Sequence, residues 1–360
     1  MRSWKTSWPV AFAALAVAAV LTAVALVNVS GGSGPLPVAD GGGTDFFARD
    51  VLWAQDSTIH PGDRTYDVSP LLVRTLRPTR HGVFLEAARG RGADVSTSWV
   101  FFDGRTSTPV PGHVRDVVVS QDGEKAAWVD LHGPWRPAGR VAQVIVTDLR
   151  SGDVVLRSSE GMGGGFGDDL GARYENLQPQ ALGFDERRFY WLDASDSGTR
   201  RRWDLRTHAS ESAEGSAARG TESGTVPVGE PWNPATGPGT WVSHGRPAAY
   251  GEGGATGFFS PDRQFLLTEA IGLLPITRPG SGETVTLTGV DRWTTFGGWQ
   301  DDTTFFAMTT SHHSDGIDPA EPDRTPARLV SCSLSSLRCT TLRRLVGTST
   351  VVLPGSEKVL

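Results

Sequence analysis

A hairpin-like pattern that recurs along the chain constrains its fold more strongly than any other feature of the sequence. Each copy is an apolar strand, an acidic turn and a second apolar strand. Ser120, Phe184, Ser260 and Trp299 occupy the same position in the four copies, immediately before the turn. Asp-Gly and Pro-Asp pairs favour tight reversals, and the flanking strands bury their bulky residues. The copies are VVVSQDGEKAAWVD, ALGFDERRFYWLD, FFSPDRQFLLTE and GGWQDDTTFFAMT.

A second hairpin follows most copies of the first, so that each unit contains four short strands. We find it in VIVTDLRSGDVVL, RRWDLRTHAS, PITRPGSGETVTL and LVSCSLSSLRCTTL. An upstream copy is WVFFDGRTSTPVP, which follows the strand GVFLEA. Four-stranded repeats of about 40–50 residues are typical of β-propeller blades, which stack because one blade cannot bury both faces alone.

Five units of this kind are expected, over residues 66–113, 114–160, 176–210, 241–290 and 291–345. FFARDVLWAQDSTIH near the start and STVVLP near the end are further strand candidates. Pairing the two ends in one blade would remove the free edges and give six blades. A seventh remains an alternative if residues 225–250 contain another blade. With 44 Gly, 23 Pro and no long amphipathic helical pattern after residue 50, the chain is predicted to be all-β.

The paired hairpins resemble those of TolB-like and WD-repeat β-propellers. Residues 117–130 together with 144–155 match best, because S-x-D-G is followed there by D-L-x-S-G. The chain departs from the pattern where Arg187, Arg263 and Asp302 replace the glycine of the first turn, and the Gly-His and Trp-Asp signatures of WD repeats are absent as a set. The resemblance covers most of residues 50–345. It implies a fold and an extracytoplasmic setting, and it carries no catalytic residues.

The N-terminus predicts a membrane anchor. Residues 1–8 contain Arg2 and Lys5, and residues 9–29 are almost uninterrupted apolar sequence, about the length that spans a bilayer. The positive flank places residues 1–8 in the cytoplasm and the remainder outside. The alternative is a cleaved signal peptide and a secreted protein. Residues 30–45 form a flexible Gly/Ser/Pro linker and 46–360 the propeller. Abundant Arg beside only three Lys suggests a high-GC bacterium.

The two cysteines are predicted to form a disulfide. Cys332 and Cys339 lie within LVSCSLSSLRCTTL, where they would face each other across a hairpin. Facing residues have Cα atoms about 4.5–5.5 Å apart, which a disulfide can span. Oxidation also fits an extracytoplasmic location. The alternative is a metal pair, but two cysteines without a nearby histidine make a poor zinc site.

Two polar loops are candidate ligand or metal loops. GMGGGFGDDLG, residues 161–171, ends in paired acids, and SHHSDGIDPAEPD, residues 311–323, mixes histidines with acids. Loop carboxylates with histidine suit a divalent cation, whereas the alternatives are a flexible inter-blade loop and a solvated acidic loop. No metal site is assigned. The candidates are Asp168, Asp169, His312, His313, Asp315 and Asp318.

No catalytic motif is present in the sequence, and no catalytic residue or cofactor is assigned. The chain lacks G-x-S-x-G, H-E-x-x-H, a Walker motif and a dinucleotide fingerprint. A net charge of −6 argues against nucleic acid. We expect a non-catalytic module that binds a protein, peptide or envelope polymer. The alternative is a hydrolase of envelope carbohydrate or ester acting through loop carboxylates, so the question of an enzyme stays open. Tryptophans in predicted strands are expected to pack between blades: Trp99, Trp128, Trp191, Trp203, Trp293 and Trp299.

Overall fold

The structure of the chain is a computed structural model. The residues it describes are 36, 43–47, 51–89, 96–120, 122–165, 167, 169–184, 187–195, 200–212, 241–243, 246–248, 257–260, 264–268, 275–278, 281, 283–291, 293–310, 327–345 and 351–354. The predicted anchor at 9–29 lies outside them. Within the described residues no helix has the length and apolar character needed to cross a membrane.

The described chain is almost entirely β, as predicted, and its strands form six four-stranded antiparallel sheets. Sheet 1 contains β28 (Val351–Val352), β1 (Leu52–Gln55), β2 (Thr58–Pro61) and β3 (Tyr66–Asp67). Sheet 2 contains β4 (Leu72–Thr79), β5 (Gly82–Arg89), β6 (Ser96–Phe102) and β7 (Ser107–Pro109). Sheet 3 contains β8 (Val114–Val119), β9 (Lys125–Asp130), β12 (Gln143–Asp148) and β13 (Val154–Ser158).

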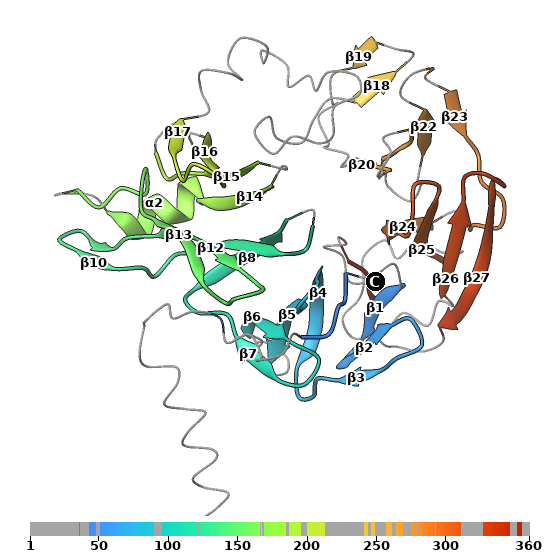
Figure 1. The fold of residues 1–360 in the computed structure, drawn as a ribbon, viewed down its shortest axis with the longest axis horizontal. Coiled ribbons are helices and arrows are strands. Elements are labelled where there is room, and N and C mark those ends of the chain that lie inside the picture. Colours follow the sequence, from blue (N-terminus) through green and yellow to red (C-terminus); the bar gives the residue numbers. More distant parts are fainter. Residues whose placement is uncertain are drawn as a thin grey trace, which may run out of the picture.

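The second half of the chain repeats the arrangement. Sheet 4 contains β14 (Gln180–Phe184), β15 (Arg188–Leu192), β16 (Arg200–Asp204) and β17 (Ser210–Ser212). Sheet 5 contains β20 (Gly257–Phe259), β21 (Leu266–Thr268), β22 (Ile276–Arg278) and β23 (Glu283–Val285). Sheet 6 contains β24 (Trp293–Trp299), β25 (Thr304–Thr310), β26 (Ala327–Ser333) and β27 (Arg338–Leu345). Figure 1 shows the six sheets following one another in chain order around a common centre.

Three shorter elements complete the described structure. Two-stranded ribbons are formed by β10 (Trp135–Arg136) with β11 (Gly139–Arg140), and by β18 (Trp241–Ser243) with β19 (Arg246–Ala248). The second ribbon occupies the region where a seventh unit was considered, and the described residues there form no four-stranded sheet. The only helix among the described residues, α2 (Leu170–Leu177), follows the Gly-rich loop and was not predicted.

The two ends of the chain share sheet 1, as the sequence predicted. Strand β28 pairs antiparallel with β1, with Ala54 opposite Val352 and Gln55 opposite Val351. The C-terminal strand thereby occupies the edge of sheet 1 where β1 would otherwise lack a partner. Strand β1 therefore lies inside sheet 1, with β28 on one side and β2 on the other.

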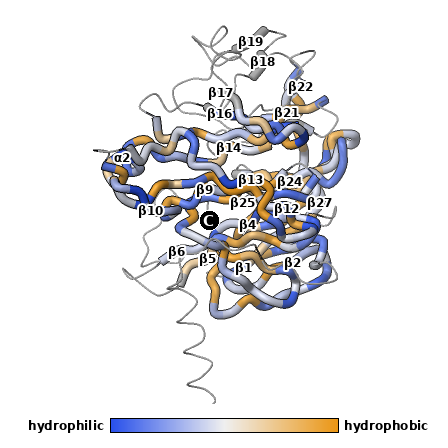
Figure 2. Tube along the Cα trace, turned by 60° about the vertical axis from the view of Figure 1, so that its left-hand side comes forward, coloured by the Kyte–Doolittle hydropathy of each residue, from blue (hydrophilic) through white to orange (hydrophobic). Residues whose placement is uncertain are grey.

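Buried apolar side chains join neighbouring sheets. One cluster contains Leu52 of sheet 1 and Leu85 of sheet 2, and another contains Trp53 of sheet 1 and Phe306 of sheet 6. Similar clusters join sheets 2 and 3, sheets 3 and 4, and sheets 5 and 6. Figure 2 shows hydrophobic segments alternating with hydrophilic ones along the sheets. The predicted packing role of the strand tryptophans is confirmed for four that are buried in the clusters between sheets: Trp99, Trp128, Trp191 and Trp203.

The repeated sequence pattern corresponds to a repeated turn geometry. Before the first turn, the Ser120 N–H donates to the carbonyl of Lys125, and the Ser260 N–H donates in the same way to Phe265, each at 2.9 Å. The second turn is tied to the first by one recurrent hydrogen bond. A leucine N–H donates at 2.8 Å to a first-turn carbonyl in three sheets, in the pairs Leu149–Glu124, Leu205–Arg187 and Leu334–Thr303.

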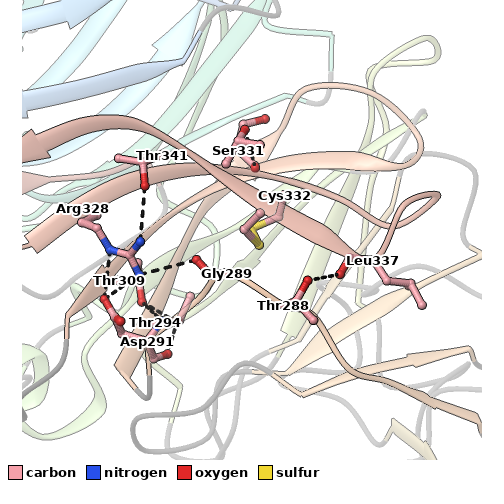
Figure 3. Close-up of a disulfide and its surroundings, with 12 residues drawn as sticks. Thr288, Gly289, Asp291, Thr294, Thr309, Arg328, Ser331, Cys332, Leu337 and Thr341 are labelled. Carbon is pink, nitrogen blue, oxygen red and sulfur yellow. Dashed lines mark hydrogen bonds and ion pairs between the residues drawn. A yellow bond between two sulfur atoms is a disulfide. The ribbon is translucent and has the colours of Figure 1, made fainter.

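The predicted disulfide is confirmed. Cys332 on β26 and Cys339 on β27 are directly opposite each other, with Cα atoms 3.9 Å apart. Figure 3 shows the segment before β24 lying against this hairpin. The Thr288 hydroxyl donates to the carbonyl of Leu337 at 3.1 Å, and the Cys339 N–H donates to the carbonyl of Thr288 at 2.8 Å. The covalent link therefore lies in a hairpin that is also anchored to the neighbouring loop.

Candidate functional site

A pocket of about 360 Å³ lies beside the ribbon β10–β11, which is inserted between β9 and β12 of sheet 3. Figure 1 shows this ribbon projecting outward from the common centre of the sheets, on the same side as α2. Its lining residues are His132, Gly133, Pro134, Trp135, Arg140, Gln143 and Arg157.

The most exposed large apolar side chain among the described residues belongs to this pocket. Trp135 has 71% of its surface exposed, although indole rings are usually buried. The guanidinium carbon of Arg140 lies 5.3 Å from the centroid of the indole, within the range of a cation–π contact. Trp135 pairs directly with Arg140 in the ribbon register, so the backbone itself places the two side chains together.

Hydrogen bonds fix the position of Arg140. Its Nη1 donates to the backbone carbonyl of His132 at 3.0 Å. The N–H of Val141 donates to the carbonyl of Pro134 at 2.9 Å, which closes the base of the ribbon. Since a guanidinium carries five N–H donors, the bond to His132 leaves it the capacity to bind a ligand oxygen.

A buried carboxylate organises the floor of the site. Asp130, only 2% exposed, accepts two hydrogen bonds at 2.9 Å through Oδ1, from the backbone N–H groups of His113 and His132. The two imidazoles stack with their centroids 4.5 Å apart. The Nε2 of Gln143 donates to Asp130 Oδ2 at 3.4 Å. Asp130 therefore serves as a backbone and amide acceptor beneath the pocket, and it is not among the residues that line it.

Burial is the main cause that lowers the pKa of His132 from its ordinary 6.5. The nearby His113 and Arg140 also lower this pKa by repulsion between positive charges, while the Asp130 carboxylate opposes them. His132 is consequently neutral at pH 7. A neutral imidazole both donates and accepts hydrogen bonds, so it offers the pocket a polar contact without a third positive charge.

Helix α2 supports the base of the ribbon from the side. The Tyr174 hydroxyl accepts from the N–H of Ala142 at 2.7 Å and donates to the carbonyl of Met162 at 2.9 Å. Met162 and Leu170 are buried in the cluster between sheets 3 and 4. A Cβ on Gly164 would lie 2.7 Å from a methyl group of Val141, so the Gly-rich loop packs closely against the ribbon. These contacts pack the described parts of the loop against the base of the ribbon.

The predicted ligand residues are only partly described. Asp169 is the N-cap of α2, and its Oδ1 accepts from the N–H of Ala172 at 3.2 Å. That bond gives Asp169 a structural role, and a ligand role for it stays a prediction. Within the described residues no group of three or more potential metal ligands is present. The other candidates lie outside the described residues: Asp168, His312, His313, Asp315 and Asp318.

A second polar cluster pairs its charges internally. Asp193 is fully buried, and its Oδ2 accepts from Arg201 Nε at 2.6 Å, while Glu160 accepts from Arg201 Nη1. The Ser195 and Ser210 hydroxyls donate to Asp193 and Glu160 respectively. Because the cation, both acids and both hydroxyls bond one another, this cluster connects sheet 4 to the loop after β13. We assign it a structural role.

Sequence reasoning missed Trp135, the residue that distinguishes the pocket. The signal was present in HGPWRPAGR, where an indole lies among turn-forming Pro and Gly residues with no apolar neighbour to bury it. A tryptophan in such a stretch has no strand periodicity that would turn it toward a core. The two arginines that line the pocket could not be grouped from sequence, since Arg140 and Arg157 come from different strands.

No protein-family model matches the chain, and no curated protein matches it. Its neighbours among solved structures include TolB-like and WD40 propeller proteins at low identity. A putative TolB from Agrobacterium tumefaciens is 12% identical with a TM-score of 0.36, covering 83% of this chain and 89% of that one. The β-propeller domain of the Trilobed protease from Pyrococcus furiosus is 10% identical with a TM-score of 0.28, covering 73% and 69%. The C-terminal WD40 domain of Sif2 is 12% identical with a TM-score of 0.27, covering 84% and 71%. All these TM-scores are below 0.5, and the function of this chain is therefore inferred from its own residues.

Proposed function

We propose that this chain is a membrane-tethered, extracytoplasmic β-propeller that binds a component of the cell envelope without converting it chemically. Residues 9–29 act as the uncleaved anchor, and residues 30–45 let the body reach away from the membrane surface. The partner is a protein, peptide or envelope polymer. Neither a cofactor nor nucleic acid takes part.

The six sheets are proposed to be the blades of one closed ring. Two observations support this. Strand β28 completes sheet 1 beside β1, and apolar clusters connect five successive pairs of sheets, including sheet 6 with sheet 1. Each blade then covers the apolar face of the next one. No cluster is described between sheets 4 and 5. The chain that connects these two sheets includes residues 213–240, which lie outside the described residues.

The observation that carries a binding role is the composition of the pocket beside Trp135. Its described lining includes two arginines, an amide, an imidazole and an exposed indole. Exposed aromatic and arginine side chains are enriched at recognition surfaces. The indole and the arginines of this pocket therefore support a binding role.

The experiment is co-sedimentation of the purified full-length chain with washed envelopes from its own host. We expect saturable binding and no release of soluble sugar or peptide fragments during incubation. Proteolysis of intact cells should remove the body of the protein from outside and leave residues 1–29 in the membrane. Unsaturable binding, or protection of the body from external protease, would contradict the proposal. Release of soluble fragments would support the hydrolase alternative.

A further inference from the structure

Residues that follow the predicted anchor are packed onto the body of the protein. Leu36 is 2% exposed and belongs to the buried cluster that joins sheets 2 and 3, which also contains Trp99. Phe46 is 3% exposed and belongs to the cluster that joins sheets 1 and 2, where its ring centroid lies 5.4 Å from that of Tyr66. Both side chains lose contact with water here, so hydrophobic burial holds them on the body. We call Leu36 and residues 43–47 the docked segment.

Backbone hydrogen bonds join the docked segment to sheet 2. The N–H of Thr44 donates to the carbonyl of Asp103 at 2.8 Å, in the turn between β6 and β7. The N–H of Phe46 donates to the carbonyl of Thr79 at 3.0 Å, at the end of β4. These bonds satisfy backbone donors that would otherwise need water, so the docked segment is bound as part of the fold.

Glycines in two turns make room for the docked segment. A Cβ on Gly104 would overlap the Thr44 hydroxyl, and a Cβ on Gly123 would lie 2.9 Å from the Phe47 ring. The guanidinium carbon of Arg80 lies 5.7 Å from the centroid of the same ring, which is a cation–π distance. Gly104 belongs to a turn of sheet 2 and Gly123 to a turn of sheet 3, so the docked segment bridges the two sheets.

The chain that remains between the predicted anchor and the docked segment is short. The predicted anchor ends at residue 29 and Leu36 is already buried, so residues 30–35 make the connection. Seven residue steps span at most about 25 Å when the chain is fully extended. The junction of sheets 2 and 3 therefore stays within this distance of the end of the anchor.

The point of attachment lies on one side of the body. Figure 1 shows sheets 3 and 6 on opposite sides of the common centre. A globular body of this chain length is roughly 50 Å across. Because the bilayer excludes the body, a short connection to sheets 2 and 3 keeps these sheets near the membrane and leaves sheet 6 farther from it on average.

We propose that the docked segment mounts the body on its anchor in one orientation, with sheets 2 and 3 next to the bilayer and sheet 6 away from it. The proposal rests on the proposed function, because residues 9–29 must be the anchor. It deepens that function by limiting where the partner lies. The pocket beside Trp135 belongs to sheet 3, so the partner is bound on the side of the body nearest the membrane.

Energy transfer to labelled lipids tests the orientation. The full-length chain is reconstituted in bilayers whose headgroups carry an acceptor dye, with a donor dye on a single introduced cysteine. Both native cysteines form the disulfide, so the introduced one is the only free thiol. Arg150→Cys labels sheet 3, and Arg344→Cys is the matched variant in sheet 6, since both arginines are exposed. Transfer from residue 150 should be at least about twofold more efficient, given a body roughly 50 Å across.

A longer connection should abolish this difference. A Gly/Ser insertion of about 20 residues between Gly34 and Pro35 leaves the docked segment intact and adds about 25 Å of average reach. The body can then turn over, so the two labelled positions should transfer with similar efficiency. A difference that persists after the insertion would mean that the short connection does not set the orientation, and it would overturn the proposal.

Hydrogen exchange tests the docking itself. A Cβ on Gly43 would collide with the carbonyl oxygen of His81, so Gly43→Ala should displace the docked segment. The N–H groups of Thr44 and Phe46 should then exchange at least about tenfold faster than in the wild type. Gly139→Ala is the matched control, because its Cβ would meet nothing within 4 Å. It should leave exchange at both positions unchanged.

The outcomes separate this proposal from the proposed function. Equal transfer from residues 150 and 344, or greater transfer from residue 344, overturns the orientation, and the binding module stands if the wild type still co-sediments with envelopes. Exchange of the Thr44 and Phe46 N–H groups of the wild type at the rate of an unfolded chain overturns the docking. If the chain is not retained in the bilayer, or does not bind envelopes, the proposed function itself is wrong.

Discussion

The turn between β12 and β13 and the turn between β26 and β27 follow the same backbone path but are stabilised by different interactions. The first runs from Asp148 to Asp153 and the second from Ser333 to Arg338. Each turn has six residues, and the second residue of each is a leucine. In both turns the leucine N–H donates at 2.8 Å to the first turn of its own sheet. The backbone path is therefore shared, although only one of the two sequences contains the D-L-x-S-G pattern.

Local polar chemistry holds the turn of sheet 3. Asp148 Oδ1 accepts from the N–H groups of Arg150 and Ser151 at 3.0 and 3.2 Å. Gly152 takes a left-handed conformation with φ 78°, which costs glycine no steric energy. The Gly152 N–H in turn donates to the carbonyl of Asp148 at 2.9 Å.

The turn of sheet 6 lacks both of these features. Ser333 offers a hydroxyl that accepts from the Ser336 N–H at 3.4 Å, a long hydrogen bond, and Leu337 takes φ 54° with 41% of its surface exposed. The disulfide lies immediately beside this turn, and Thr288 binds it from outside. The comparison indicates that the disulfide and the loop containing Thr288 fix the strand register in sheet 6. In sheet 3 the turn capped by Asp148 fixes the register without such help.

The largest expected effect comes from removing the disulfide. Cys332→Ala together with Cys339→Ala should lower the free energy of unfolding by about 2.5 kcal/mol, as loop-closure entropy predicts for a sequence separation of 7. Urea denaturation followed by tryptophan fluorescence measures the change. Reducing agent should destabilise the wild type similarly and leave the double variant unaffected. Equal stability of the two proteins would mean that Thr288 and strand pairing already fix this hairpin.

Removal of the cap in sheet 3 should have the next largest effect. Asp148→Ala deletes an acceptor of two backbone N–H groups, and we expect a loss of about 1.5 kcal/mol in the same measurement. Asp153→Ala is the matched control, since Asp153 joins the turn through its backbone carbonyl. That control should cost less than about 0.5 kcal/mol. Similar losses in both variants would show that net charge, and not the cap, determines the effect.

The recurring turns were the part of the fold that the sequence predicted best. Each unit carries its own strand and turn pattern, so the pairs of hairpins and the disulfide follow from local signals. The shared sheet 1 was instead predicted from the need to pair the strand candidates at the two ends of the chain. Degenerate turns were still recognisable, because the buried strands kept their apolar residues where the glycine was lost, as at Arg187. Helix α2 was missed since its eight residues carry weak amphipathic character and follow a Gly-rich loop.

The candidate site could not be assembled from the sequence for a physical reason. Its groups come from a ribbon, a sheet edge and a buried aspartate, and only the folded register of β9, β12 and β13 brings Arg157 beside Arg140. The polar loops drew attention because charge density is visible in a sequence. The described pocket is instead organised by Trp135, whose exposure is visible only in three dimensions.

A smaller effect should follow from exchanging the left-handed residues of the two turns. Gly152→Ala adds a Cβ at φ 78° and should cost about 1 kcal/mol. Leu337→Gly relieves the same strain at φ 54°, but it increases the entropy of the unfolded chain, so a net gain of about 0.5 kcal/mol is expected. If the two substitutions change the free energy of unfolding in opposite directions, the turn of sheet 6 contains backbone strain that the turn of sheet 3 avoids. A loss in both variants would mean that the Leu337 side chain contributes packing despite its exposure.

The smallest expected effect concerns pH and uses the equivalent turn of sheet 4. Backbone hydrogen bonds from Thr207 and then Arg206 lower the pKa of Asp204 from its ordinary 3.8. The unfolded chain therefore binds the proton more readily than the folded chain. The stabilisation from this cap is complete above pH 3.8 and disappears as pH falls through the lower, folded pKa.

Asp204→Asn tests this dependence of stability on pH. The turn of sheet 6 serves for comparison, because it has Ser333 and no carboxylate at the equivalent position. The wild type should exceed the Asp204→Asn variant in stability at about pH 6, and the difference should shrink as acid protonates the carboxylate. Ser333→Asn in sheet 6 is the control, because neither residue titrates and its effect should not vary with pH. A constant difference for Asp204→Asn down to about pH 2 would show that the carboxylate charge does not cap the turn, and that an amide replaces it fully.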